Sequence, residues 1–307
     1  MKRISVIIVS WNTRGLLKDC LNSVGIPGDS LVQEVIVVDN ASSDGSPDMV
    51  AEEFPEVTLI RSKENLGFAR GNNLGIGRAS GSWLALVNSD VVVHPGCLEQ
   101  LANYLDTHSD VGLAGPRVIG RDGRLQPTWR QLPTIWTTAC RSLALDKIFS
   151  RVSKRKLNQW VNGDPVHVEV LSGCFWVARR EAVAQVGGLD ERFFFYAEDL
   201  DWCKRFGDAG WKVVFVPAAT ATHYGGGSSG AAPLRYSIEL LRANLAYWRK
   251  HHGVMGLAFF FFLSVIHHTT RLLIRGVETI FGRGLDSAYK CRRSLVCLQW
   301  LLTGREV

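Results

Sequence analysis

The stretch Ile4-Ser-Val-Ile-Ile-Val-Ser-Trp-Asn12 decides the fold, because a short apolar run ends there in polar residues. The apolar run, at 4–9, is too short for a secretory signal and is typical of a buried strand. Working outward, we expect strands at 4–9, 34–38, 57–60 and 83–87 and helices at 16–24, 48–54, 68–79 and 98–107. This alternation predicts βαβ units, and hence an α/β fold with a mostly parallel sheet flanked by helices.

The later part of the body continues the pattern less regularly. We expect strands at 213–216 and 220–223 and helices at 179–186 and 200–206, whereas residues 128–165 show no clear pattern and are expected to vary. A glycine-rich stretch at 225–230 then ends the body. The sequence therefore predicts a catalytic or binding domain over 1–232 and a separate helical region over 233–307.

Polar residues follow three of the predicted strands, at 10–12, 39–40 and 88–90. Ligands of open parallel sheets bind beyond the carboxyl ends of the strands, so these residues predict one site at one rim. Asp90 there suits Mg²⁺ or Mn²⁺, which prefer oxygen ligands. Each stretch also fits a local turn or helix cap, and that alternative stays open.

Two further segments carry candidate residues for the site. The stretch 64–75 places glycines and amides at the start of a helix, where backbone N–H groups favour an anion, although close helix packing would also explain the glycines. It is neither a Walker A loop nor a G-x-G-x-x-G motif, which disfavours a kinase or a dehydrogenase. His223, at a strand end, is a candidate metal ligand or a structural histidine.

The segment Glu198-Asp-Leu-Asp201 follows the aromatic run at 193–196. These acids would cap a helix, but three carboxylates in four residues repel one another. Apolar neighbours should raise the pKa of at least one of them, as is usual for a general base.

Composition and charge describe a folded body with a basic tail. The 307 residues are 46% apolar and 21% charged, which excludes a disordered chain. Seven cysteines without a C-x-x-C pair favour a reducing, cytosolic environment. From residue 234 onward there are eleven Lys or Arg and four Asp or Glu, which gives this region a charge of +7. Since the whole chain has a net charge of +6, the body carries −1. This distribution favours an anionic membrane surface over nucleic acid.

The tail contains an uncharged apolar run, Val254–Ile266, of thirteen residues. Spanning a bilayer takes roughly 20 residues, so we expect a peripheral helix lying in the membrane interface. A buried hairpin or homo-oligomer contact, and a span that continues to Ile274, are the alternatives.

Five motifs in order resemble the family 2 glycosyltransferases of GT-A fold, and among them the rhamnosyltransferase-like branch. The resemblance covers residues 3–225 and rests on the segments 4–12, 35–46, 65–73, 86–90 and 195–205. It implies a GT-A, Rossmann-like sheet with a C-terminal helical appendage that associates with the membrane.

The resemblance also implies roles for individual residues. The donor-binding residues would be Ser10, Trp11, Asn12, Arg14, Asp39, Asn40, Asn65, Gly67, Asn72, Asn88 and Ser89. Asp39 would accept the pyrimidine N3–H, and Asp90 and His223 would hold Mg²⁺ or Mn²⁺, with Asn88 replacing the first aspartate of the usual D-x-D. Asp199 would be the catalytic base, Glu198 and Asp201 would orient it or the acceptor, and Trp176 would line the acceptor site.

The implied reaction is an inverting transfer of a sugar to a hydroxyl group, with dTDP-L-rhamnose as the first expected donor and a UDP-hexose as the second. The basic tail favours a polyprenyl-diphosphate-linked acceptor at the cytoplasmic leaflet. A non-catalytic nucleotide-binding scaffold is the rival from another class. A nucleotidyltransferase would need a basic glycine-rich loop after the first strand, which residues 10–14 do not provide.

Overall fold

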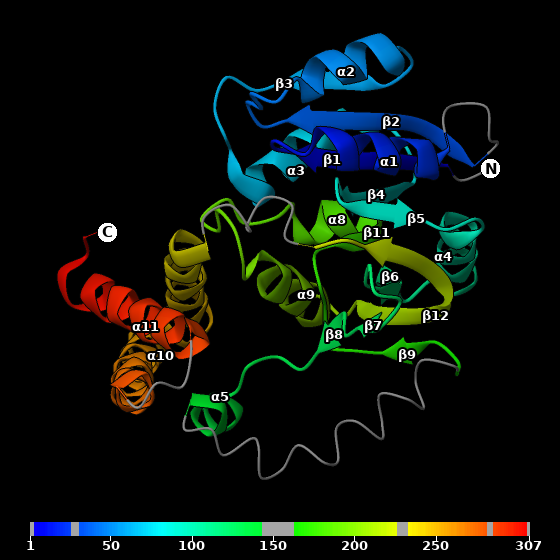
Figure 1. Ribbon diagram of the computed structural model, residues 1–307. Helices are drawn as coiled ribbons and strands as arrows, with labels where there is room; N and C mark the ends of the chain where they lie inside the picture. Colours follow the sequence, from blue (N-terminus) through cyan, green and yellow to red (C-terminus); the bar gives the residue numbers. More distant parts are fainter. Residues whose placement is uncertain (1–2, 26–30, 143–162, 226–232, 281–284, 306–307) are drawn as a thin grey trace. The chain divides into compact units, whose positions relative to one another are not determined.

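The computed structural model of the chain describes residues 3–25, 31–142, 163–225, 233–280 and 285–305, and Figure 1 shows it. These residues form two compact units. Unit 1 contains the described residues of 1–132, 155–194 and 198–230, and unit 2 contains those of 133–154, 195–197 and 231–307. The second unit thus starts near the expected boundary but also takes in two segments from earlier in the chain. Residues 143–162 of the unpatterned stretch, and most of the glycine-rich one, lie outside the described residues.

The sheet of unit 1 is mixed, and its longest pairings are parallel. Strands β1 (Ile4–Ser10), β2 (Val32–Asp39), β3 (Thr58–Arg61) and β4 (Trp83–Asn88) run parallel in the order β3-β2-β1-β4. Nearly every residue of β1 is buried, which shows that helices or loops cover both faces of the sheet, as parallel sheets require. The predicted α/β sheet is confirmed.

Beyond β4 the sheet continues through β11 (Phe175–Arg179), which pairs antiparallel with β4 and with β6 (Val111–Ile119). Strand β12 (Lys212–His223) is parallel to β6, and its far side pairs with β5 (Val91–Val93). The sequence predicts two strands where β12 is one, because the pairing only shifts register between Val216 and Thr220. Short strands complete the set: β7 (Leu125–Gln126), β8 (Trp129–Arg130), β9 (Val166–His167) and β10 (Val170–Leu171).

Six helices accompany these strands in the described part of unit 1 (Figure 1). They are α1 (Arg14–Val24), α2 (Ser46–Glu53), α3 (Gly67–Arg78), α4 (Cys97–Thr107), α8 (Arg180–Val186) and α9 (Glu198–Asp208). In α1 the buried positions Leu17, Cys20, Leu21 and Val24 recur at helical spacing and join the main apolar core. That spacing is why the segment forms an amphipathic helix against the sheet.

The regular secondary structure in the described residues of unit 2 consists of helices α5 (Ile135–Ser142), α10 (Pro233–Ile280) and α11 (Leu285–Thr303). Helix α10 packs against α11 and α5 and breaks at Gly253, whose φ of 65° and ψ of −161° are not helical. The apolar run Val254–Ile266 lies inside this helix, which continues beyond the run to Ile280. As a result, the stretch Leu234–Glu278 is long and apolar enough to cross a membrane by length and composition alone.

Candidate active site

The carboxyl ends of β1, β2 and β4 lie side by side, as the rim hypothesis predicts. Ser10 is in register with Asp39 across the β1–β2 pairing, and Val9 is in register with Asn88 across β1–β4. Three polar strand ends therefore meet at one edge of the sheet.

Asp39 and Asn40 are almost fully buried at this edge. The Asp39 Oδ2 accepts a hydrogen bond from the Ser42 N–H at 3.1 Å, whereas its Oδ1 is buried and has no partner. The Asn40 Nδ2 donates to the Gly67 carbonyl at 3.0 Å, and its Oδ1 likewise has no partner. A buried acceptor without a donor is costly, so both oxygens fit a site that receives N–H or O–H groups from a ligand.

The loop after β1 is held against the loop after β2. Asn12, at a left-handed φ of 53°, donates its N–H to Ser42 Oγ at 3.0 Å and accepts the Ser43 N–H at 2.8 Å. The Arg14 N–H donates to Asp44 Oδ2 at 2.9 Å. These bonds fix the two loops as one rigid surface and leave the Arg14 side chain exposed.

A chain of buried hydroxyl groups links β1 to the turn after β4. Thr13 Oγ1 lies 3.0 Å from Ser10 Oγ and 2.9 Å from Ser89 Oγ. The neighbouring Trp11 and Asn88 are half-buried. The hydroxyl chain places Asp90, the next residue, in a fixed position relative to the first loop.

Gly67 begins α3 at a left-handed φ of 76°, where other residues are strained. Its N–H bonds to Asn65 Oδ1 at 2.9 Å, and a Cβ at this position would collide with the Phe194 carbonyl oxygen. The same carbonyl accepts the Phe68 N–H at 2.8 Å, so the start of α3 is pinned to the segment that leads to the acidic cluster. Asn72 is buried, and its amide donates to the Phe68 carbonyl within the helix.

Asp90 and His223 face each other, with the Asp90 Oδ1 3.3 Å from the His223 Nε2. Gln126 fixes the ring, because its Nε2 donates to the His223 carbonyl and its Oε1 therefore faces Nδ1, both at 2.9 Å. An amide oxygen only accepts, so Nδ1 carries the proton and the Nε2 lone pair points toward a carboxylate oxygen. Two such acceptors repel each other unless a proton or a cation lies between them.

This arrangement fits a divalent cation. A ligating histidine commonly donates its other ring N–H to an oxygen, as His223 does to Gln126. The Tyr224 N–H bonds to the Asp90 carbonyl at 2.9 Å, which holds Asp90 and His223 at a fixed separation. Within the described residues, no group of three His, Cys, Asp or Glu side chains could hold a metal by itself.

The first two residues of the acidic cluster are nearly buried but differ in their partners. The Asp199 Oδ2 accepts a hydrogen bond from the Arg130 guanidinium at 2.7 Å, and its Oδ1 accepts the Leu200 N–H at 2.8 Å. The Glu198 Oε2 has no partner. Burial, and then the charge of Asp199, raise the pKa of Glu198 to about 8, against the opposing effect of Arg130. The prediction that one acid has a raised pKa is confirmed, and that acid is Glu198.

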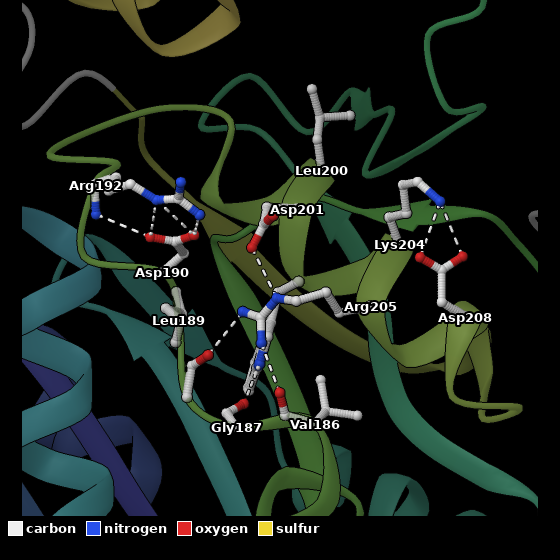
Figure 2. A network of polar contacts seen from close by, with 12 residues as sticks. Val186, Gly187, Leu189, Asp190, Arg192, Leu200, Asp201, Lys204, Arg205 and Asp208 are labelled. Carbon is white, nitrogen blue, oxygen red and sulfur yellow. Dashed lines mark hydrogen bonds and ion pairs between the residues drawn. The ribbon is translucent and has the colours of Figure 1, made fainter. Parts of the chain in front are cut away.

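The Asp201 carboxylate faces Arg205, as Figure 2 shows. It is fully buried and pairs with Arg205 at 2.8 Å, while Arg205 also donates to the carbonyls of Val186 and Gly188 at 2.8 and 2.7 Å. We therefore assign Asp201 to the support of this loop, which corrects the expectation that it orients Asp199 or the acceptor.

Trp176 also differs from expectation. It is fully buried, its ring lies against Trp202 at a centroid distance of 5.2 Å, and its Nε1 donates to the Leu171 carbonyl. It is a core residue and does not line an acceptor site.

Two residues directly before the cluster, Tyr196 and Ala197, have left-handed φ values of 73° and 62°. Such conformations cost roughly 1–3 kcal/mol each for residues other than glycine and collect at functional sites. Sequence reasoning missed Gln126 and Arg130, because β7 and β8 have two residues each and are too short to leave a periodic signal.

Comparison with known proteins agrees with this geometry. Residues 5–187 match the family model described as glycosyl transferase family 2. The chain is 31% identical over 278 residues to the N-acetylglucosaminyl-diphospho-decaprenol L-rhamnosyltransferase of Mycobacterium tuberculosis, covering 81% of this chain and 85% of that protein.

Solved structures share the fold at lower identity. The mannosyltransferase PcManGT from Pyrobaculum calidifontis, in complex with GDP-Man and Mn²⁺, has a TM-score of 0.57 at 17% identity and covers 99% of this chain and 88% of that one. TarS of S. aureus has a TM-score of 0.52 at 15% identity, with 98% and 81% covered. These neighbours are of GT-A type, which confirms the predicted fold class.

Proposed function

The chain belongs to the family 2 glycosyltransferases, and we propose that it transfers L-rhamnose from dTDP-L-rhamnose to a hydroxyl group of a polyprenyl-diphosphate-linked saccharide in cell-wall or surface-polysaccharide assembly. The observation that carries the proposal is the similarity to the mycobacterial rhamnosyltransferase over four-fifths of the chain. The rim of the sheet supports it with unpaired acceptor oxygens where a nucleotide would bind.

The donor nucleotide is assigned to the surface formed by the first two loops. The free Oδ1 of Asp39 suits the N3–H of thymine or uracil, because it is buried and needs a donor. Asn65 and Gly67 supply the start of α3, where N–H groups favour the negative diphosphate.

Asp90 and His223 would hold Mg²⁺ or Mn²⁺, since their facing acceptor atoms require a positive charge between them. The metal, when bound, would neutralise the charge that develops on the departing diphosphate. With two protein ligands, further oxygen ligands would come from the donor diphosphate and from water. Gln126 keeps the His223 ring in the orientation that this role needs.

Asp199 is proposed as the general base. The acceptor hydroxyl oxygen attacks the anomeric carbon while the bond from that carbon to the diphosphate breaks, and the hydroxyl proton passes to the Asp199 carboxylate. Arg130 donates to the Oδ2 of this carboxylate, so Arg130 has to turn away before that oxygen can take the proton. Glu198 is protonated at neutral pH because of its raised pKa and therefore adds no second negative charge.

Membrane attachment is assigned to α10. Its residues Met255, Phe262, Ile266, Leu273 and Val277 are each at least half exposed, and their spacing of seven and four places them on one side of the helix. At about 100° per residue, His268 and Arg271 lie on the opposite side. A helix with one apolar and one basic side fits an in-plane position at the cytoplasmic face better than a span, which would put Arg271 among lipid chains.

One experiment tests the donor, the acceptor and catalysis together. Purified full-length protein in mild detergent is incubated with dTDP-L-rhamnose or UDP-hexoses, with and without polyprenyl-diphosphate-linked N-acetylglucosamine, and nucleoside diphosphate release is followed. We expect release with dTDP-L-rhamnose and lipid acceptor together. Turnover of a UDP-hexose instead refutes the donor assignment, and nucleotide binding without any turnover identifies a scaffold.

Flotation with vesicles tests the attachment. We expect binding to phosphatidylglycerol vesicles at low salt, partial release at high salt because ionic contacts are screened, and complete release only with detergent. Failure to float with these vesicles at low salt would make α10 a packing or oligomer element.

A further inference from the structure

Unit 2 contains a cavity of about 260 Å³ that the proposed chemistry does not use. Helices α5, α10 and α11 all contribute to its lining. Its polar wall contains Arg141, His267, His268 and Arg293, and its apolar wall includes Leu241 and Phe260. Among the described residues that line it, none is acidic.

The arginines that line this cavity, Arg141 and Arg293, form no ion pair with a carboxylate among the described residues. Arg271 does not line the cavity, but its charge acts on His268, and it likewise forms no ion pair with a described carboxylate. Burial, followed by the positive charges of Arg293 and Arg275, lowers the pKa of Arg271. Positive charges that crowd one another without a carboxylate are stabilised when an anion binds.

The histidines add unused hydrogen-bonding capacity. The Nδ1 of His268 is buried and has no partner. The His267 Nδ1 lies 2.8 Å from the Ser142 carbonyl oxygen, which can only accept, so Nδ1 carries the proton. The other ring nitrogen, Nε2, takes no part in this hydrogen bond. Burial, and then His267 and Arg293, lower the pKa of His268 to about 4, so the ring is neutral until an anion offsets the cost of charging it.

We propose that this cavity binds the phosphate groups of a lipid diphosphate, the carrier of the acceptor saccharide. Arginine guanidinium groups match phosphate oxygens in pairs, and the apolar wall suits the first carbons of the attached chain. His268 and Arg271 lie on the side of α10 opposite its apolar stripe, so an in-plane helix turns that side toward the headgroup layer. The identity of the lipid rests on the proposed function, whereas the affinity for phosphate on a lipid does not.

The test compares ligands that differ in one feature each, on the full-length protein in neutral detergent. Binding of farnesyl diphosphate, farnesol and inorganic pyrophosphate is measured by calorimetry for the wild type, Arg293→Gln and Arg292→Gln. Arg292 is the matched control, because it is the adjacent residue, is exposed and does not line the cavity. Circular dichroism and melting temperature check that each variant is folded.

We expect farnesyl diphosphate to bind the wild type and Arg292→Gln alike and to bind Arg293→Gln at least about 10-fold more weakly, the loss expected for a charged hydrogen bond. Equal binding by Arg293→Gln, or equal binding of farnesol and farnesyl diphosphate, overturns the proposal. If Arg293→Gln is misfolded, Arg141→Gln replaces it, with the same expected loss and the same refuting result.

Phosphatidylglycerol vesicles separate the two sources of lipid phosphate. If Arg293→Gln loses vesicle binding but keeps its affinity for farnesyl diphosphate, the cavity binds the phosphates of bilayer lipids and the assignment to a carrier diphosphate is wrong. Donor nucleotide binding by Arg293→Gln should equal that of the wild type. The two proposals can fail separately. If the wild type transfers rhamnose to no acceptor, while its binding of farnesyl diphosphate still depends on Arg293, the proposed function is refuted and the cavity assignment stands.

Discussion

Asp199 and Asp201 lie two residues apart on α9, and the same substitution should affect a different property at each position. Asp→Asn keeps the size of the side chain and one acceptor oxygen but removes the charge. We expect Asp201→Asn to lower stability and Asp199→Asn to lower turnover, because one carboxylate supports a loop and the other is the proposed base.

The size of each effect follows from burial and partners. Asp201 is fully buried, and Arg205, one-fifth exposed, is left with an unbalanced charge when it is neutralised. Breaking a buried pair costs about 3–5 kcal/mol, and we expect about 3 kcal/mol here because Asn still accepts a hydrogen bond. This corresponds to a fall in melting temperature of roughly 6–12 °C.

Asp199 pairs with an Arg130 side chain that is 39% exposed, so the pair contributes at most about 1 kcal/mol. Asn keeps an oxygen that accepts the Leu200 N–H. The melting temperature should therefore change little, while loss of a general base lowers turnover by at least about 10².

Two measurements on each variant decide the question: the melting temperature by calorimetry, and the initial rate of nucleoside diphosphate release with saturating donor and acceptor. The reasoning is refuted if Asp199→Asn keeps activity within a few-fold of the wild type. It also fails if Asp201→Asn melts like the wild type but loses turnover, since that would make Asp201 part of the chemistry.

Four other substitutions test the rest of the site. Between about pH 4.5 and 8 the folded chain keeps a proton on Glu198 that the unfolded chain has lost, so the free energy of unfolding falls with rising pH by up to about 1.4 kcal/mol per pH unit. Glu198→Gln should remove this pH dependence in denaturant titrations, and an unchanged pH dependence contradicts the assignment. Gly67→Ala should cost at least about 1–2 kcal/mol, because of its left-handed φ and the contact with the Phe194 carbonyl, and an unchanged melting temperature would show that α3 can shift. His223→Ala and Asp90→Ala should each raise the Mn²⁺ concentration needed for half-maximal activity at least about 10-fold; full wild-type activity in excess EDTA removes the metal from the mechanism.

The strands and the rim could be predicted because they follow from local patterns. Apolar runs such as Ile4–Val9 and Trp83–Val87 are buried in any compact fold of the chain. Parallel pairing of the strands then brings together the polar residues that follow them. The C-terminal helix was harder to delimit, since its apolar run has thirteen residues while the helix continues to Ile280.

The partners of the site residues could not be predicted, because they come from distant segments with no motif. Arg130 lies 69 residues before Asp199, and Gln126 lies 97 residues before His223. Both follow a turn in short strands whose position depends on the finished sheet. For the same reason the residue pattern by itself could not separate Asp199 from Asp201, and only the family resemblance assigned the base to Asp199.

These partners also explain how three acids in four residues coexist, and why Asp199 is the one suited to act as a base. Glu198 avoids repulsion by keeping its proton, so at neutral pH it is not a carboxylate that could take up the proton of the acceptor hydroxyl. Asp201 is neutralised by Arg205, which two backbone carbonyls also hold in place, so this pair cannot open without disturbing the loop. Asp199 is neutralised by Arg130, whose guanidinium is the more exposed of the two and can exchange its carboxylate for water or for a substrate phosphate. Of the three carboxylates, only Asp199 can therefore be both charged and released, which is what removal of a proton from the acceptor hydroxyl requires.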